Sequence, residues 1–185
     1  MKEILHTVAG EMQEVLTQVD ANQTVELAEE IQQANRIFIA GTGRSGLAGK
    51  MFAMRLMHSG YAVYVVGETV TPSLESSDLL LLISGSGGTA SLLNYAKKAK
   101  DITALVALVT TNTQSAIGEY SNHIVRIPAA TKKRLETEPD TIQPLGSQFD
   151  QSAHLILDSV IVYLLQTYPG NRNEESLNQK HTNLE

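Results

Sequence analysis

Short apolar segments alternate with segments of helical periodicity along most of this chain, and this alternation restricts the possible folds more than any other feature. The apolar segments, each short enough for a strand, are residues 36–40, 61–66, 78–83, 103–109 and 123–127. Apolar residues at helical spacing predict helices at 4–34 (broken in two at Asp20-Ala21-Asn22), 45–59, 90–100, 113–120 and 148–166. Strands that alternate with helices form a parallel sheet covered on both faces. We therefore predict an α/β fold with a five-stranded parallel sheet.

The length and composition favour a single soluble domain. The 185 residues suffice for one domain, which we divide into N-terminal helices (1–34), an α/β core (35–167) and a polar tail (168–185). No apolar run approaches the roughly 20 residues of a membrane span, and residues 1–14 lack a signal-peptide core. We expect a cytoplasmic protein without membrane contact. A net charge of −6 without a long basic run argues against nucleic-acid binding, and the absence of cysteine excludes thiolate chemistry.

A glycine- and hydroxyl-rich loop, residues 84–89, joins the third predicted strand to a helix. Its glycines, Gly85 and Gly87 among them, allow a ligand to approach the backbone closely. The hydroxyls of Ser84, Ser86 and Thr89 add donors, and the helix that follows offers unpaired N–H groups. We predict that this loop binds a phosphate dianion. The alternative is a tight turn in which Thr89 only caps the helix.

A second glycine-rich loop, residues 41–46, follows the first predicted strand. It fits the dinucleotide pattern G-x-G-x-x-G only loosely, because the one acid after the second strand is Glu68 and a Walker lysine is absent. Arg44 could instead contact an anionic substrate through its fork of donors. Since ligands bind beyond the carboxyl ends of parallel strands, we assign Gly43, Arg44 and Ser45 to substrate binding.

Several segments resemble 6-phospho-3-hexuloisomerase, a family of the sugar-isomerase (SIS) domain type. They are 41–46 (GTGRSG), 52–58 (FAMRLMH), 66–72 (VGETVTP), 83–87 (ISGSG), 144–149 (PLGSQF) and 181–185 (HTNLE). The resemblance implies interconversion of 3-hexulose 6-phosphate and fructose 6-phosphate in the ribulose monophosphate pathway, without a metal or other cofactor. It also implies a homotetramer of flavodoxin-like SIS domains with sites built between subunits.

Two positions depart from the family pattern, and three residues are candidates for the catalytic base. Gly88 stands where the family usually has Glu in the phosphate loop, and Asp150 stands where it usually has Glu after Phe149. Asp150 is our first candidate for the base, although an acid in the first turn of a helix also complements the helix dipole. Glu68 is the second candidate for the base, and the alternative is that it is an ordinary charged residue in a loop. The resemblance implies that His181, in the tail, completes a site in a neighbouring subunit.

Other polar groups have plainer interpretations. Asp150, His154 and Asp158 recur every fourth residue, which suits a metal site, but we favour a polar contact with a neighbouring helix. His58 ends a predicted helix and fits a capping role as well as a catalytic one. The basic cluster 132–134 is interpreted as a solvated loop, with a ligand-facing role as the alternative.

Two further functions remain open at this stage. One is a sugar-phosphate sensor with impaired catalysis, which the departures at Gly88 and Asp150 suggest. The other is an aldose–ketose isomerase acting on a different sugar phosphate. In each case the partner is a small sugar phosphate, and the apolar surface of the N-terminal and last helices predicts a homo-oligomer.

Overall fold

A five-stranded parallel sheet forms the centre of the computed structural model, which describes residues 1–169 and 174–181. The strand order is β2-β1-β3-β4-β5. The strands are β1 (Ile37–Gly41), β2 (Val63–Val65), β3 (Leu79–Ile83), β4 (Leu105–Thr110) and β5 (His123–Arg126). All pairings are parallel, and Gly41 lies opposite Ile83 in the register of β1 and β3. The predicted α/β sheet is confirmed, and the loops after β1 and β3 leave it at the same edge.

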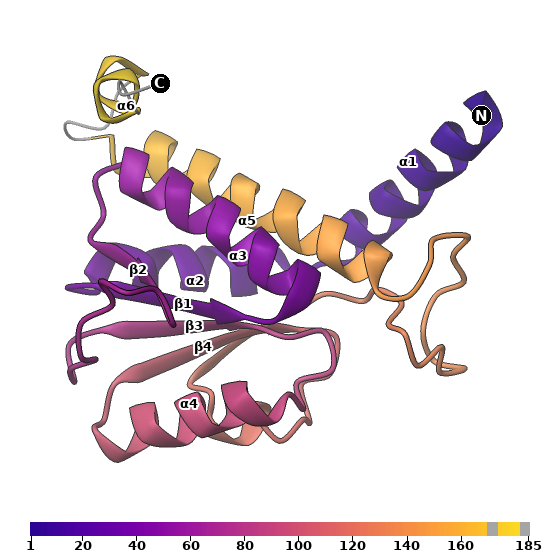
Figure 1. Ribbon diagram of the computed structural model, residues 1–185. Coiled ribbons are helices and arrows are strands. Elements are labelled where there is room, and N and C mark those ends of the chain that lie inside the picture. The colour runs from indigo at the N-terminus through magenta and orange to yellow at the C-terminus, as the bar shows by residue number, and fades with distance from the viewer. Residues whose placement is uncertain (170–173, 182–185) are drawn as a thin grey trace.

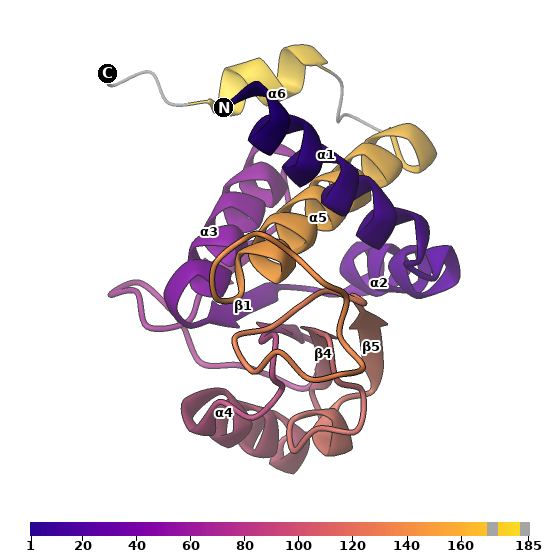
Figure 2. The same cartoon turned by 90° about the vertical axis from the view of Figure 1, so that its right-hand side faces the viewer.

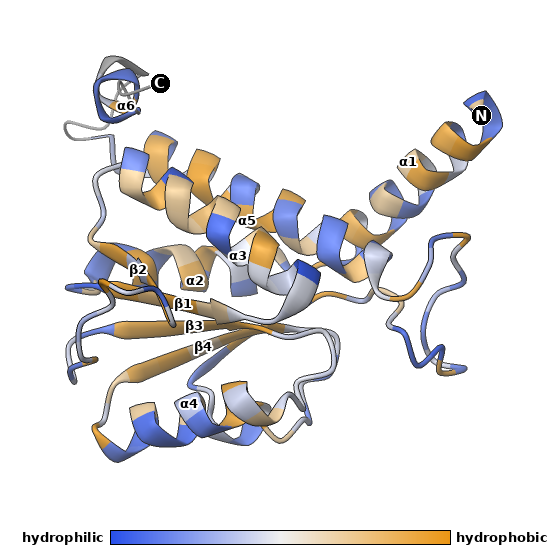
Figure 3. Cartoon of the chain, viewed as in Figure 1, coloured by the Kyte–Doolittle hydropathy of each residue, from blue (hydrophilic) through white to orange (hydrophobic). Residues whose placement is uncertain are grey.

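Helices cover both faces of the sheet (Figure 1). One face carries α1 (Lys2–Thr17), α2 (Ala21–Gln33), α3 (Gly43–His58) and α5 (Ser147–Thr167), and the other carries α4 (Ala90–Asp101) and the short 3-10 helix η1 (Gly118–Tyr120). Along β3, Leu79 and Leu81 pack in the first layer, whereas Leu80 and Leu82 pack in the second. Burial on both faces explains why the strands are continuously apolar, as their colour in Figure 3 shows.

The N-terminal helix α1 stands partly away from the rest of the molecule (Figures 1 and 2). Met12 and Val15 are buried near its C-terminal end, whereas Ile4 and Leu5 at the other end are exposed. Asp20 then caps α2 by accepting a hydrogen bond from the backbone N–H of Asn22 at 2.9 Å. The predicted break between two N-terminal helices is thus confirmed.

Two segments differ from the sequence-based prediction. The helix predicted at 113–120 is a turn that ends in η1. Its backbone N–H groups at Gln114 and Gly118 bond to the side chains of Asn112 and Ser115, which compete with helical hydrogen bonds. The tail, predicted as polar and without an assigned helix, contains the helix α6 (Glu174–Lys180), which packs against α3. Within the described ranges, no helix is both long and apolar enough to cross a membrane.

Candidate active site

The carboxyl edge of the sheet between β1 and β3 brings together three segments that the sequence analysis singled out. The chain runs from β1 to β2 on one side and then to β3 on the other side of β1, so the connections diverge at this point. Ligands in open α/β sheets bind at such a switch point. The loops 41–46 and 84–89 both start here, and the first turn of α5 approaches them.

The loop 84–89 forms a compact turn at the start of α4. Ser84 is buried, and its N–H donates to the carbonyl of Val109 at 3.0 Å. The hydroxyls of Ser84 and Thr89 lie 3.3 Å apart, and the Ser86 hydroxyl accepts from the N–H of Gly88 at 3.3 Å. Thr89 occupies the N-cap position, but within the described residues its side chain makes no capping hydrogen bond. The first-turn N–H groups of α4 therefore remain open to an anion.

The loop 41–46 contacts Asp150 in the first turn of α5. The Ser45 hydroxyl donates to one carboxylate oxygen of Asp150 at 2.7 Å, and Nε of Arg44 donates to the other at 3.2 Å. The Asp150 side chain is only 12% exposed, whereas Arg44 is largely exposed. Gly43, with φ of 56°, opens α3 just before these two residues. The structure thus places two of the predicted binding residues, Arg44 and Ser45, on the carboxylate of the predicted base.

Phe149 links this carboxylate to the loop 84–89. The phenyl ring packs directly on Gly85, so closely that a Cβ added there would lie 3.1 Å from Cδ1 of the ring. Phe149 itself is buried. Because Phe149 and Asp150 are consecutive, the contact fixes the separation between the predicted phosphate loop and the predicted base.

Glu68 and His181 are not part of the group of residues around the Asp150 carboxylate. Glu68, after β2, is exposed and forms an ion pair of 2.5 Å with Lys50 of α3. The ring of His181 lies 5.2 Å from that of His58, in the last turn of α3. At 1.5 Å per residue, Ser45 and His58 are separated by roughly 20 Å along this helix. Within one chain, His181 is therefore far from the carboxylate of Asp150.

The other polar groups on α3 and α5 do not form a metal centre. His154 pairs with Asp158 at 3.8 Å, and Asp150 instead contacts α3. The expected contact with a neighbouring helix is thus found for Asp150, whereas His154 and Asp158 contact each other. No group of three or more His, Cys, Asp or Glu side chains suited to a metal occurs in the described part of the chain. His58 is buried, and this burial, together with His181 and Arg55, lowers its pKa.

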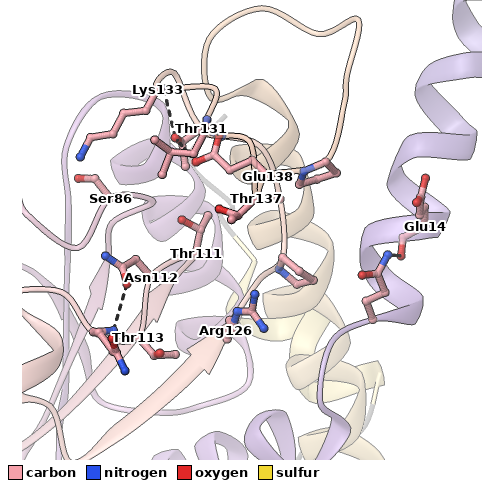
Figure 4. Close-up of a pocket in the computed structure, with 16 residues that line it drawn as sticks. Glu14, Ser86, Thr111, Asn112, Thr113, Arg126, Thr131, Lys133, Thr137 and Glu138 are labelled. Carbon is pink, nitrogen blue, oxygen red and sulfur yellow. Dashed lines mark hydrogen bonds between the residues drawn. The ribbon is translucent and has the colours of Figure 1, made fainter.

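A cavity of about 630 Å³ opens beside the loop 84–89, and its walls include residues that the sequence analysis did not assign (Figure 4). Ser86 contributes from the loop 84–89, and Thr111, Asn112 and Thr113 contribute from the loop after β4. The run of polar residues directly after a buried strand was the available signal, but we interpreted Thr113 as the start of a helix and assigned no role to Thr111 and Asn112. Arg126, at the end of β5, and Lys133 also line this cavity.

Comparisons with known proteins identify relatives over the full length of the chain. The family model for the SIS domain matches residues 30–145. A 3-hexulose-6-phosphate isomerase of Bacillus subtilis (strain 168) is 39% identical over 183 residues, which cover 99% of this chain and 98% of that protein. One from Methanocaldococcus jannaschii is 40% identical over 163 residues, covering 88% and 84%. A crystal structure of a Methanococcus jannaschii protein, described as inferring 3-hexulose-6-phosphate isomerase function, matches with a TM-score of 0.84 and 36% identity over all of both chains.

Proposed function

Because this chain belongs to the SIS domain family, as an isomerase of the 3-hexulose-6-phosphate isomerase type, we propose that it interconverts 3-hexulose 6-phosphate and fructose 6-phosphate through an enediol. The reaction moves a carbonyl group between C3 and C2 of the sugar. It requires a base, donors for the developing oxyanion and a site for the phosphate. The observation that carries the proposal is the placement of Asp150 beside two such donors and next to the loop 84–89.

Asp150 is the proposed base. Hydrogen bonds from Ser45 and Arg44 hold its carboxylate in a fixed position at this edge of the sheet, where it can accept a proton from the substrate. It takes the proton from C2, the electrons of that C–H bond form the C2=C3 bond of the enediol, and the carbonyl oxygen at C3 gains a proton. Asp150 then returns the proton that it took from C2 to C3, and the hydroxyl on C2 loses its proton, which generates the carbonyl at C2. Arg44, whose guanidinium is largely exposed, then stabilises the charge that develops on oxygen.

The loop 84–89 is the proposed phosphate site, with Ser84, Ser86 and Thr89 as donors. Gly85 and Gly87, two of its three glycines, bring the backbone close to the ligand, and the N-terminus of α4 supplies N–H groups and a favourable dipole. This arrangement anchors the substrate at one end. The reacting carbons then extend toward Asp150, which lies beyond the ring of Phe149.

A homotetramer in which His181 reaches the site of another subunit remains our proposal for the tail. The separation of roughly 20 Å along α3 means that His181 can act at this edge only if a second copy supplies it. Exposed apolar side chains on α1 and α3, including Leu5, Met51 and Met54, provide surface for such contacts. Light scattering of the intact protein measures the assembly directly.

The decisive experiment compares Asp150→Asn with the wild-type protein on fructose 6-phosphate in deuterated water. An amide keeps the shape of the carboxylate but cannot accept the proton. We expect turnover and deuterium incorporation into the sugar to fall by at least about 100-fold, while affinity for inorganic phosphate is retained.

Two variants serve as controls for this experiment. Asp158→Asn changes a partly exposed acid on the same helix, and we expect it to retain activity. Glu68→Gln tests the alternative base. If Asp150→Asn stays active and Glu68→Gln does not, the base is Glu68 and the proposal for α5 is wrong.

A further inference from the structure

We propose that Lys133 is the cation of the phosphate site, delivered to the loop 84–89 by the segment after β5. This inference rests on the proposed function, because it adds a residue to the same phosphate site. The loop 84–89 itself contains only hydroxyls and backbone groups. A phosphate monoester carries close to two negative charges at neutral pH. We therefore expect the compensating positive charge among the residues that line the cavity beside the loop.

The cations nearest to the loop 41–46 are already neutralised. Arg44 pairs with Asp150, and Lys50 pairs with Glu68. Lys133 and Arg126 line the cavity that also includes Ser86. Within residues 1–169 and 174–181, neither of these two cations forms an ion pair. The cavity thus combines two uncompensated cations with the hydroxyl of the phosphate loop.

The acidic residues that line the cavity do not replace a phosphate as the partner of Lys133. Both carboxylate oxygens of Glu138 are occupied, because they accept from the N–H and hydroxyl of Thr131 and from the N–H of Leu135. Glu14 projects from α1, and in Figure 4 it stands on the opposite side of the cavity from Lys133. The same view shows the Lys133 side chain on the side of the cavity where Ser86 lies.

Hydrogen bonds hold the segment that carries Lys133 in place. The Lys133 N–H donates to the hydroxyl of Thr131 at 3.2 Å, and Thr131 is buried and held by Glu138. Farther along, Glu11 of α1 accepts from Thr141, from the N–H of Ile142 and from Gln143. The segment is therefore closed on itself by Thr131 and Glu138 and tied to α1 by Glu11, so Lys133 is presented from a positioned backbone.

The test replaces Lys133 by Met, which keeps the aliphatic length and removes the charge. We expect Lys133→Met to raise both KM for the sugar phosphate and Kd for inorganic phosphate by about 10-fold, the usual scale for one charge-assisted hydrogen bond. We expect kcat to stay within about twofold, because at saturating substrate the phosphate still occupies the loop 84–89. The rise in KM should shrink below about pH 6, where the phosphate monoester of the substrate loses one charge.

Three other variants make the test specific. Lys132→Met removes the neighbouring exposed charge, which does not line the cavity, and should leave KM and Kd unchanged. Lys133→Arg should restore most of the affinity. Lys133→Met with unchanged phosphate affinity, or an equal loss in Lys132→Met, overturns the inference. A loss confined to Arg126→Met assigns the role to Arg126 and also overturns it.

The proposed isomerase function and the proposed role of Lys133 can be rejected separately. Turnover of fructose 6-phosphate by the wild-type protein tests the isomerase function. Binding of inorganic phosphate by Lys133→Met tests the cation, and it does so even where another sugar phosphate is the substrate. Wild-type turnover combined with unchanged phosphate affinity in the variant rejects the role of Lys133 alone.

Discussion

Replacing Gly87 by Ala perturbs the proposed phosphate loop at the point where a side chain is least tolerated. Gly87 has φ of 60°, in the left-handed region that favours glycine. A Cβ built on its backbone would overlap the side chain of Ser115, which is itself buried. The backbone of the loop is also fixed there, because Gly87 accepts from the N–H of Ile117 at 3.0 Å. The loop therefore cannot simply shift away from Ser115.

Two contributions set the expected loss in free energy of unfolding. A left-handed conformation costs a non-glycine residue roughly 1–2 kcal/mol. Overpacking against Ser115 adds about 1–3 kcal/mol. We expect Gly87→Ala to be destabilised by roughly 2–5 kcal/mol. Gly88→Ala is the matched control, because the nearest atoms to its added Cβ are 3.9–4.0 Å away, and it should change stability by less than about 0.5 kcal/mol.

Denaturant unfolding at a fixed protein concentration measures both variants, and a double-mutant cycle with Ser115→Gly separates the two contributions. In the Ser115→Gly background the overlap disappears, so only the conformational cost of roughly 1–2 kcal/mol should remain. Equal stabilities for Gly87→Ala and Gly88→Ala would refute the reasoning. So would a cycle without coupling, since the overlap with Ser115 would then contribute nothing.

Two further predictions concern carboxylates outside the proposed site. Burial raises the pKa of Glu30, with Glu26 adding to the shift and His123 opposing it, and one of its buried oxygens has no hydrogen-bond partner among the described residues. The folded state then holds a proton that the unfolded chain has released, so this contribution favours folding below pH 4.5 and is lost as the pH rises. Glu30→Gln should therefore stabilise the protein by roughly 0.5–1 kcal/mol at pH 7, and by less near pH 4, in denaturant unfolding. An equal gain in stability at both pH values would contradict this prediction. Burial opposes ionisation of Glu11, but hydrogen bonds from Thr141, Gln143 and Ile142 and the charge of Arg134 outweigh it and lower its pKa. Glu11→Gln should speed hydrogen exchange at the Ile142 amide by about tenfold, whereas the exposed Glu3→Gln on the same helix should leave it unchanged; equal rates in both variants would show that Glu11 does not hold this segment.

Local patterns in the sequence predicted the sheet and the loops at its carboxyl edge. Continuous apolar segments identified the strands, because both faces of the sheet are buried. Residues 113–120 were wrongly predicted to form a helix. The side chains of Asn112 and Ser115 accept hydrogen bonds from the backbone N–H groups of Gln114 and Gly118, and the composition of the segment does not distinguish such a turn from a helix. The helix α6 was missed because its seven residues gain their structure from packing on α3.

The contacts between residues of the candidate site could not be predicted from the sequence. Arg44 was expected to contact the substrate. In the structure it contacts Asp150, which lies 106 positions away in the sequence. Likewise, Lys133 belonged to a cluster that composition alone could not place. Such long-range contacts depend on how the segments are arranged in space, which local periodicity does not encode.

The packing of Phe149 on Gly85 connects the proposed phosphate site with the proposed base. The ring rests on the backbone of the proposed phosphate loop, and the next residue is the proposed base. A phosphate bound at this loop would contact the same backbone that supports Phe149, and would thereby also steady the platform from which Asp150 acts. Binding energy from the non-reacting end can thereby lower the barrier at the carbons. A sugar without phosphate should therefore react slowly even at saturating concentration, and free phosphate added separately should partly restore its rate.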